Sequence, residues 1–317
     1  MAFVDRLWKK EGAFAVALFA DEHLSLDVLD EQHLILKHPI KGLWHPKPLL
    51  YQADSFLFVK GDELFLFYEM QHWDNPGVIA MRKTRDLKFW TDPIVVLKQP
   101  FHLSFPYVFM DHGFVYMVPE SQESDAIHLF RADNDELTSF SKVRTLLYQE
   151  RKDGIHYNYN DSHIYKKNNI YYLFTSYQKN WMYYQELFVS DDLLQGEFVR
   201  HPKSPICKSN EFGRNGGSLI HYDDRLLRVA QDCHSEYGDN VSLMEIDELS
   251  LENYKEHIFR RNVLPDNSIF REGGHQLNIA CFKNQYVYAT DYKQNRWAWY
   301  RLWIAFLTKL KLHEHRG

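Results

Sequence analysis

One pattern recurs along this chain and limits the folds that it can adopt: an alternating apolar run, a tight polar turn and a second alternating run. Residues 54–69, DSFLFVKGDELFLFYE, give the clearest copy, with a Gly-Asp turn in its centre. Further copies occupy residues 106–121, 161–176, 217–232 and, more weakly, 275–291. The first four copies are each followed by another strand-like run, at residues 77–90, 126–140, 183–198 and 241–254.

The copies begin about 50–60 residues apart, which is typical of a propeller blade built from antiparallel strands. Five copies fill the chain, so we predict an all-β fold, a five-bladed β-propeller spanning residues 48–295. An unrelated series of hairpins in a β-sandwich is the alternative. Within the N-terminal segment, residues 1–47, the runs Ala13–Ala20 and His33–Leu36 are expected to complete the last blade, because closure removes exposed strand edges.

The C-terminal stretch, residues 296–317, has a different period. Its apolar residues recur at helical spacing and alternate with basic ones, which predicts a short C-terminal amphipathic helix and tail. Such a helix either packs on the side of the propeller or makes peripheral membrane contact through residues 297–317.

Composition narrows the class of protein further. The formal net charge of -6 argues against a nucleic-acid partner, which would require a basic footprint. The 3 cysteines form no CxxC pair, and no apolar run reaches the length of a signal peptide or of a membrane span, about 18 residues. We therefore expect a cytoplasmic location, extending to the inner face of the membrane if the terminal helix binds lipid. Oligomeric state is left open.

Propeller geometry brings the two ends of each hairpin copy to one rim of the central channel. The first positions of the copies are Asp54, Pro106 or Tyr107, Asp161, Gly217 and Leu277, and the last are Glu69, Glu120, Ser176, Asp232 and Asp291. Several carboxylates would therefore converge on one mouth, an arrangement that is unfavourable unless sugars, water, a cation or Arg214 compensate it. The alternative is that Asp54 and Asp161 cap turns through their side chains and that Glu69 is a solvated loop acid.

Several other residues are candidates for substrate binding. Arg214, in the Gly-rich segment EFGRNGGSL, can reach a hydroxyl, a phosphate or a rim carboxylate. His275 opens the fifth copy and is expected to point into the channel, either as a ligand or as a structural histidine. Trp73, Trp181, Tyr157 and Tyr159 either stack on sugar faces or pack the tops of the blades. The histidines show no zinc-site spacing, so we predict no metal and no cofactor, although the channel leaves room for a cation.

The segments ADSFLFVKGDELFLFYE, FHLSFPYVFMDHGFVYMVPES, NDSHIYKKNNIYYLFTS and RVAQDC resemble the N-terminal domain family of plant glucosamine inositolphosphorylceramide transferases and bacterial relatives. That family is itself similar to the five-bladed propellers of glycoside hydrolase family 43. The resemblance covers roughly residues 45–295 and implies a carbohydrate-active protein. In family 43 hydrolases an Asp that opens the first blade is the general base, a second Asp adjusts a pKa and a Glu is the general acid.

Transferred to this chain, the resemblance implies that Asp54 activates water. Glu120 is the candidate acid by its position on the rim, and if the protein is a hydrolase it would protonate the leaving oxygen while Asp161 adjusts the pKa of that acid. The chain departs from the family 43 pattern, because Asp54 is followed by Ser55 and the second blade opens with Phe105-Pro106-Tyr107. We therefore expect a glycoside-hydrolase-like, carbohydrate-active propeller of glycan or polysaccharide metabolism that takes a saccharide or glycolipid. Substrate-binding roles are expected for Glu69, Arg214, Asp232, His275, Trp73 and Trp181. The alternatives are a non-catalytic glycan- or glycolipid-binding module and a glycosyltransferase of surface-polysaccharide biosynthesis.

Overall fold

The computed structural model describes residues 10–40, 49–72, 76–149, 151–152, 155–156 and 158–297. Within these ranges the regular secondary structure consists of β-strands and one short 3-10 turn, Gln122–Ser124, with no α-helix. No helix of this described part is long and apolar enough to cross a membrane.

The strands form five groups, which we call blades 1 to 5. Blade 1 contains β3 (Leu49–Lys60), β4 (Glu63–His72), β5 (Val78–Thr84) and β6 (Ile94–Leu97). Blade 2 contains β7 (Ser104–Asp111), β8 (Phe114–Glu120), β9 (Ala126–Ala132) and β10 (Phe140–Tyr148). Blade 3 contains β13 (Asn160–Lys167), β14 (Ile170–Lys179), β15 (Met182–Ser190), β16 (Val199–Arg200) and β17 (Cys207–Lys208).

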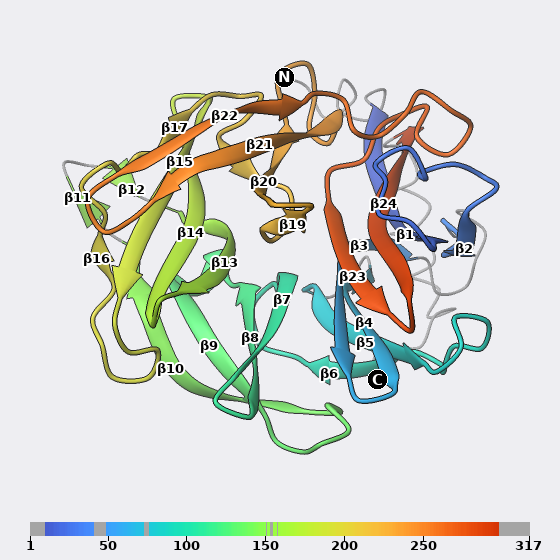
Figure 1. Ribbon diagram of the computed structural model, residues 1–317, viewed down its shortest axis with the longest axis horizontal. Helices are drawn as coiled ribbons and strands as arrows, with labels where there is room; N and C mark the ends of the chain where they lie inside the picture. The colour runs from blue at the N-terminus through green and yellow to red at the C-terminus, as the bar shows by residue number, and fades with distance from the viewer. Residues whose placement is uncertain are drawn as a thin grey trace, which may run out of the picture.

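Blade 4 contains β18 (Arg214–Asn215), β19 (Ile220–Tyr222), β20 (Arg225–Asp232), β21 (Asn240–Leu249) and β22 (Tyr254–Arg260). Blade 5 combines β23 (Leu277–Phe282) and β24 (Gln285–Trp297) with the N-terminal β1 (Lys10–Asp21) and β2 (Leu34–Lys37). The short pair β11 (Arg151–Lys152) and β12 (Ile155–His156) stands apart. Figure 1 shows the blades around a common centre, with β7, β13, β19 and β23 nearest to it.

Each predicted hairpin is present, and its turn residues explain why it forms there. The turns Asn168-Asn169 and Lys283-Asn284 place both central residues at positive φ, between 48° and 63°. His112-Gly113 does the same between β7 and β8, at 46° and 80°. Two consecutive positive φ values give the turn whose twist matches that of paired strands, and Asn and Gly tolerate this conformation. The predicted strand-turn-strand copies are confirmed.

The N-terminal strand closes the ring. β1 pairs antiparallel with β24 over its whole length, from Lys10 opposite Trp297 to Asp21 opposite Tyr286. β1 also touches β3 through one parallel bridge, Ala15 to Gln52, so blades 5 and 1 form one continuous sheet. The two strands expected within residues 1–47 are therefore present as β1 and β2. The expected boundary at residues 47 and 48 lies outside the described residues.

The C-terminal boundary needs a correction. We expected a helix from residue 296, but Arg296 and Trp297 continue β24, because the pairing with β1 extends to Lys10 and Glu11. The remaining part of the predicted helix, residues 298–317, lies outside the described residues.

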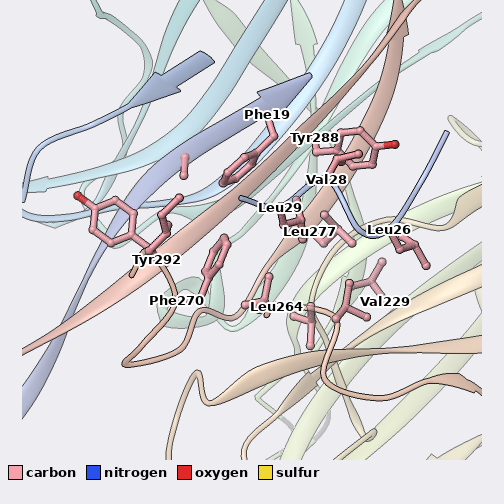
Figure 2. Packing of buried hydrophobic residues seen from close by; sticks show 14 of the residues in the cluster. Phe19, Leu26, Val28, Leu29, Val229, Leu264, Phe270, Leu277, Tyr288 and Tyr292 are labelled. Atoms are coloured by element: carbon pink, nitrogen blue, oxygen red, sulfur yellow. The ribbon is translucent and has the colours of Figure 1, made fainter. Parts of the chain in front are cut away.

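Many of the aromatic residues in the described ranges are core residues. Between blades 4 and 5, Phe19 and Tyr288 pack with Phe270, Leu277 and Val229 in the cluster drawn in Figure 2. Burying such side chains contributes about 1.5–3 kcal/mol each, so the contacts between blades stabilise the ring. Among the predicted sugar platforms, Tyr159 belongs to this class of residue, because it is buried against Tyr177 and Phe188.

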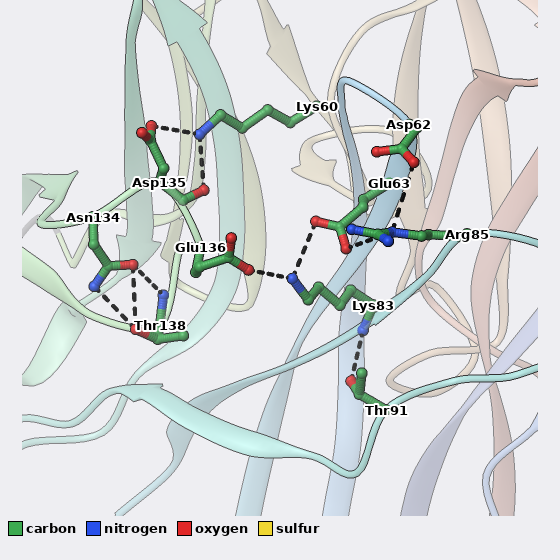
Figure 3. Close-up of polar contacts among 10 residues, drawn as sticks. All are labelled: Lys60, Asp62, Glu63, Lys83, Arg85, Thr91, Asn134, Asp135, Glu136 and Thr138. Carbon is green, nitrogen blue, oxygen red and sulfur yellow. Dashed lines mark hydrogen bonds and ion pairs between the residues drawn. The ribbon is translucent and has the colours of Figure 1, made fainter.

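Charged side chains connect blades 1 and 2 near their hairpin turns. Figure 3 shows Lys60 of β3 donating to Asp135, at 2.8 Å, and Lys83 of β5 contacting both Glu63 and Glu136. These ion pairs are partly solvated and lie at the opposite end of blade 1 from Glu69, since β4 runs from Glu63 to His72. They orient neighbouring blades without contributing to the mouth.

Candidate functional site

The same backbone irregularity occurs at the start of the inner strand in three blades. Strand register shifts between Ala53 and Phe56, between Ser104 and Tyr107, and between Asn160 and His163. The first residue inside each shift has a positive φ: 54° at Asp54, 44° at Phe105 and 51° at Asp161. Left-handed backbone at non-Gly residues costs about 1–3 kcal/mol each and concentrates at functional sites. Each bulge changes the direction in which the side chains inside the register shift point. Asp54 and Asp161 are two of these residues.

Asp54 is buried at the centre of the site. Its Oδ2 accepts the backbone N–H of Phe105 at 3.2 Å, and its Oδ1 lies 3.3 Å from His275 Nε2. Burial raises the pKa of Asp54 to about 6, although the positive charge of His275 opposes that rise. The Asp161 and Asp291 carboxylates raise it further. Asp54 therefore changes protonation state close to neutral pH.

His275 connects Asp54 to Asp291. His275 Nδ1 lies 2.7 Å from Asp291 Oδ2, and its backbone N–H donates to Asp291 Oδ1 at 2.8 Å. Burial alone would lower the pKa of His275, but the adjacent Asp291 carboxylate raises it above its ordinary value. The donor atoms of these three residues lie within 4.8 Å of one another, close enough to share a cation. Asp291 Oδ2 also accepts the backbone N–H of Asp54 at 3.3 Å, so Asp291 links both neighbours in the site.

Glu69 and Glu120 occupy equivalent positions in blades 1 and 2. Glu69 pairs with Ala53 and Glu120 with Ser104, in each case beside the residue that begins the bulge. Burial, reinforced by neighbouring carboxylates, raises the pKa of both well above the usual range of a glutamate. Glu69 Oε1 accepts no hydrogen bond, and its neighbour His102 lies 3.4 Å away with a pKa that burial lowers. Burial therefore favours the protonated form of both glutamates, in which each can donate a hydrogen bond.

The carboxylate of Asp161 is neutralised by Arg214. The two side chains form a close, buried ion pair, and Arg214 Nη1 also donates to the Tyr183 hydroxyl at 3.3 Å. Asn215 Nδ2 donates to the backbone carbonyl of Asp161 at 2.6 Å. Asp161 also contacts Glu120 and raises the pKa of that carboxyl, after burial itself. Asp161 is thus in position to influence the protonation of Glu120.

These groups surround one open cavity of about 600 Å³. Its lining residues are Gly12, Phe14, Tyr51, Ala53, Asp54, Glu69, His102, Ser104, Glu120, Arg214, Glu236, Tyr237, His275, Lys293 and Asn295. The predicted residues Asp54, Glu69, Glu120, Arg214 and His275 are therefore brought together. Asp161 lies directly behind Arg214 and Glu120.

The cavity also has an aromatic wall that sequence reasoning missed. The ring of Phe14 stacks on Tyr51 with centroids 6.2 Å apart, and it meets the edge of Tyr237 at 5.7 Å. Tyr237 lies 5.0 Å from the Arg214 guanidinium yet keeps 43% of its surface exposed. Lys293 fixes the backbone here, because its Nζ donates to the Tyr237 carbonyl at 2.9 Å. Phe14 belongs to β1, so the wall exists only because the N-terminal strand closes the ring.

Two predicted substrate-binding residues in the described part of the chain, Asp232 and Trp181, do not line the cavity. In the strand pairing, the residue opposite Arg214 is Gln231 and not Asp232. Asp232 instead lies near Asp239 and Glu211, and burial raises its pKa. Trp181 is 87% exposed at the tip between β14 and β15 and does not line the cavity. Trp73 lies outside the described residues, as does Tyr157.

Comparison with known proteins identifies the family. Residues 45–268 match the family model described as "Glucosamine inositolphosphorylceramide transferase 1, N-terminal". The chain belongs to this family. Curated relatives include glucosamine inositolphosphorylceramide transferase 1 of Arabidopsis thaliana, 36% identical over 219 residues, and that of Oryza sativa subsp. japonica, 33% identical over 219 residues. Each alignment covers 66% of this chain but only 27% and 28% of those proteins, so the chain spans about a quarter of their length.

Solved structures of glycoside hydrolases share the fold at low sequence identity. A family 117 hydrolase of Zobellia galactanivorans has a TM-score of 0.53 at 11% identity, covering 76% of this chain and 84% of its own. A thermostable family 43 hydrolase has a TM-score of 0.54 at 13% identity, covering 74% and 82%. The family 32 β-fructofuranosidase of Bombyx mori has 0.54 at 14%, covering 78% and 57%. This chain therefore has an all-β fold that resembles the five-bladed propellers of these hydrolases.

Proposed function

We propose that this chain is a five-bladed propeller whose mouth binds the sugar portion of a glycolipid or oligosaccharide and acts within glycosyl transfer. One observation carries the proposal: buried carboxyl groups and aromatic rings line the same open cavity. Membership of the transferase N-terminal family supports the association with glycosyl transfer, because its curated members are named as transferases.

The chemistry of the two walls suits a polyhydroxylated ring. In the protonated form that burial favours, Glu69 and Glu120 can each donate one hydrogen bond and accept others. Such groups suit the hydroxyl groups of a sugar, which also both donate and accept. Glu69 Oε1 has no hydrogen-bond partner, and burying such an atom is unfavourable until a ligand satisfies it. Tyr237 offers a ring face backed by Arg214, which is suitable for stacking against the C–H face of a sugar.

Glycoside hydrolysis is the second candidate function, and the presence of two buried carboxyls, Asp54 and Glu120, in one cavity favours it. Asp54, with a pKa of about 6, is ionised at pH 7 and can take a proton from water. Burial, followed by the Asp161 carboxylate, raises the pKa of Glu120 and so favours the form that can give a proton to the leaving oxygen. One carboxyl that takes a proton and one that gives a proton are the pair that glycoside hydrolysis requires. In this mechanism water attacks the anomeric carbon and gives its proton to Asp54. The glycosidic bond breaks, and the leaving oxygen takes the proton of Glu120.

Binding and turnover measurements on the same variants distinguish the two candidates. Isothermal titration calorimetry with a panel of oligosaccharides and glycolipid head groups measures affinity, and product release from the same panel measures turnover. For a binding module, Asp54→Asn and Glu120→Gln shift affinity and no variant, including the wild type, releases product. For a hydrolase, the wild type releases product and both substitutions abolish release while retaining affinity. An absence of binding to every ligand would contradict both candidates.

A further inference from the structure

Trp181 stands at the tip of the hairpin between β14 and β15, where its backbone is unfavourable. Lys179 pairs with Met182, so Asn180 and Trp181 form a two-residue turn with φ values of 51° and 64°. Turns with two positive φ values favour Asn-Gly, and a bulky residue at the second position is uncommon. The Trp181 side chain is also 87% exposed, so packing within the described chain does not repay this conformation.

The tip projects beyond the mouth. Ser176 of β14 pairs with Asn160, the residue before Asp161 at the rim. The strand continues from Ser176 to Lys179 before the turn, which carries Trp181 about 10 Å past the rim at roughly 3.3 Å per residue.

A second exposed aromatic residue lies at the same end of the neighbouring blade. Tyr148 ends β10 opposite Ala126, shortly after Glu120 enters the cavity at the end of β8. Gln149 then donates to the carbonyl of Asp125 at 2.9 Å, which fixes this segment at the mouth end. Tyr148 is 73% exposed.

These two rings differ from a sugar-stacking platform. A platform has one ring face packed on the protein, as Tyr237 has on Arg214, and is therefore about half exposed. Tyr148 and Trp181 are 73% and 87% exposed, so most of their surface is free of contacts. Trp and Tyr with free rings partition into the interface between lipid head groups and acyl chains. Lys179, two residues before Trp181, can extend to lipid phosphates.

We propose that the mouth end of the propeller docks on a lipid bilayer, with Trp181 and Tyr148 inserted at the interface, so that the cavity faces the membrane surface. This inference goes beyond the proposed function, because it assigns an orientation and a partner surface to residues outside the cavity. It also explains how a glycolipid head group would enter the mouth without leaving the bilayer.

The test compares three variants of the full chain by co-sedimentation with phosphatidylcholine vesicles containing a minor fraction of phosphatidylserine. Trp181→Gly creates the favoured Asn-Gly turn, so it should keep or raise the melting temperature while lowering vesicle affinity about tenfold. Tyr148→Ser should lower vesicle affinity to a smaller extent. Phe89→Ser is the matched control: Phe89 is 79% exposed but follows β5 at the opposite end of blade 1, so vesicle affinity should not change.

Three results would overturn the proposal. They are failure of the wild-type chain to bind vesicles, equal vesicle affinity of Trp181→Gly and wild type, and equal losses in Trp181→Gly and Phe89→Ser. A loss of oligosaccharide affinity in Trp181→Gly with vesicle binding unchanged would assign Trp181 to a glycan platform instead. Vesicle binding is measured without any sugar, so its failure is separate from failure of the proposed function.

Discussion

Asp291 holds His275 by two contacts, one 2.7 Å from its carboxylate Oδ2 to the imidazole Nδ1 and one 2.8 Å from its Oδ1 to the backbone nitrogen. Asp291 lies on β24, which pairs with the N-terminal strand, whereas Asp54, the other neighbour of His275, lies on β3. The strand that pairs with β1 to close the ring therefore also holds His275 in the cavity, through Asp291.

Replacing Asp291 by Asn should lower the pKa of His275, because the carboxylate that favours its charged form is removed while burial still opposes it. Loss of one partner of this buried pair should also cost about 3 kcal/mol of stability. Nuclear magnetic resonance of labelled histidine, with His275→Gln for assignment, measures the pKa. If His275 has the same pKa in Asp291→Asn as in the wild type, the Asp291 carboxylate does not stabilise the protonated form of His275.

The buried carboxyls predict an unusual pH dependence of stability. Folding raises the pKa of Glu69 and Glu120 above 4.5 and that of Asp54 from 3.8 to about 6. The folded state consequently holds more protons than the unfolded chain above pH 4, and stability falls as pH rises through that window. Glu120→Gln should reduce this decline and raise stability at neutral pH, by on the order of 1 kcal/mol.

Urea unfolding between pH 4 and 8 measures the effect, with Glu197→Gln as a control at an exposed carboxylate of blade 3. The control should follow the wild type at every pH. If Glu120→Gln and Glu197→Gln have the same pH profile, Glu120 is ionised in the folded protein and its role as a proton donor is wrong.

Arg214→Met should be strongly destabilising, by about 3–5 kcal/mol, because Asp161 would remain buried without its partner. The double variant Arg214→Met with Asp161→Asn should recover a large part of that loss, since the uncompensated charge is gone. Chemical denaturation of the single and double variants gives the coupling energy. Additive losses would mean that the ion pair does not determine the stability of the rim.

Tyr237 should contribute to ligand affinity through its ring rather than its hydroxyl. Tyr237→Phe keeps the ring over Arg214 and should leave affinity nearly unchanged, whereas Tyr237→Ala should lower it about tenfold, or about 1.4 kcal/mol. Calorimetry with the best ligand of the panel measures both. Equal losses in the two variants would assign the contribution to the hydroxyl.

The local parts of this structure could be predicted from sequence because they depend on local patterns. Alternating Phe, Leu and Tyr with Asn, Asp or Gly turns defined each hairpin, and the equivalence of hairpin ends placed Glu69 and Glu120 at one mouth. The same reasoning did not hold at Asp232, which does not line the cavity. There the inner strand of blade 4 is divided into β18 and β19, so the hairpin equivalence that held in blades 1 and 2 no longer applies.

The aromatic wall could not be predicted in this way. Phe14 reaches the cavity through the pairing of β1 with β24, and Tyr237 through a loop whose conformation depends on Lys293. Neither position carries a local signal, because both depend on contacts between residues far apart in sequence. Trp181 resembled a sugar platform in sequence, but unlike Tyr237 it is 87% exposed and does not line the cavity.

We propose that the ligand site is the cavity lined by the buried carboxyl groups and by the aromatic rings of Phe14, Tyr51 and Tyr237. Calorimetric titration of the saccharide and head-group panel into wild type, Tyr237→Ala and Trp181→Gly tests it most directly. We predict at least one saccharide that binds the wild type and Trp181→Gly with similar affinity and Tyr237→Ala about tenfold more weakly. Equal affinity of all three proteins for every ligand that binds would place the site elsewhere and contradict this account.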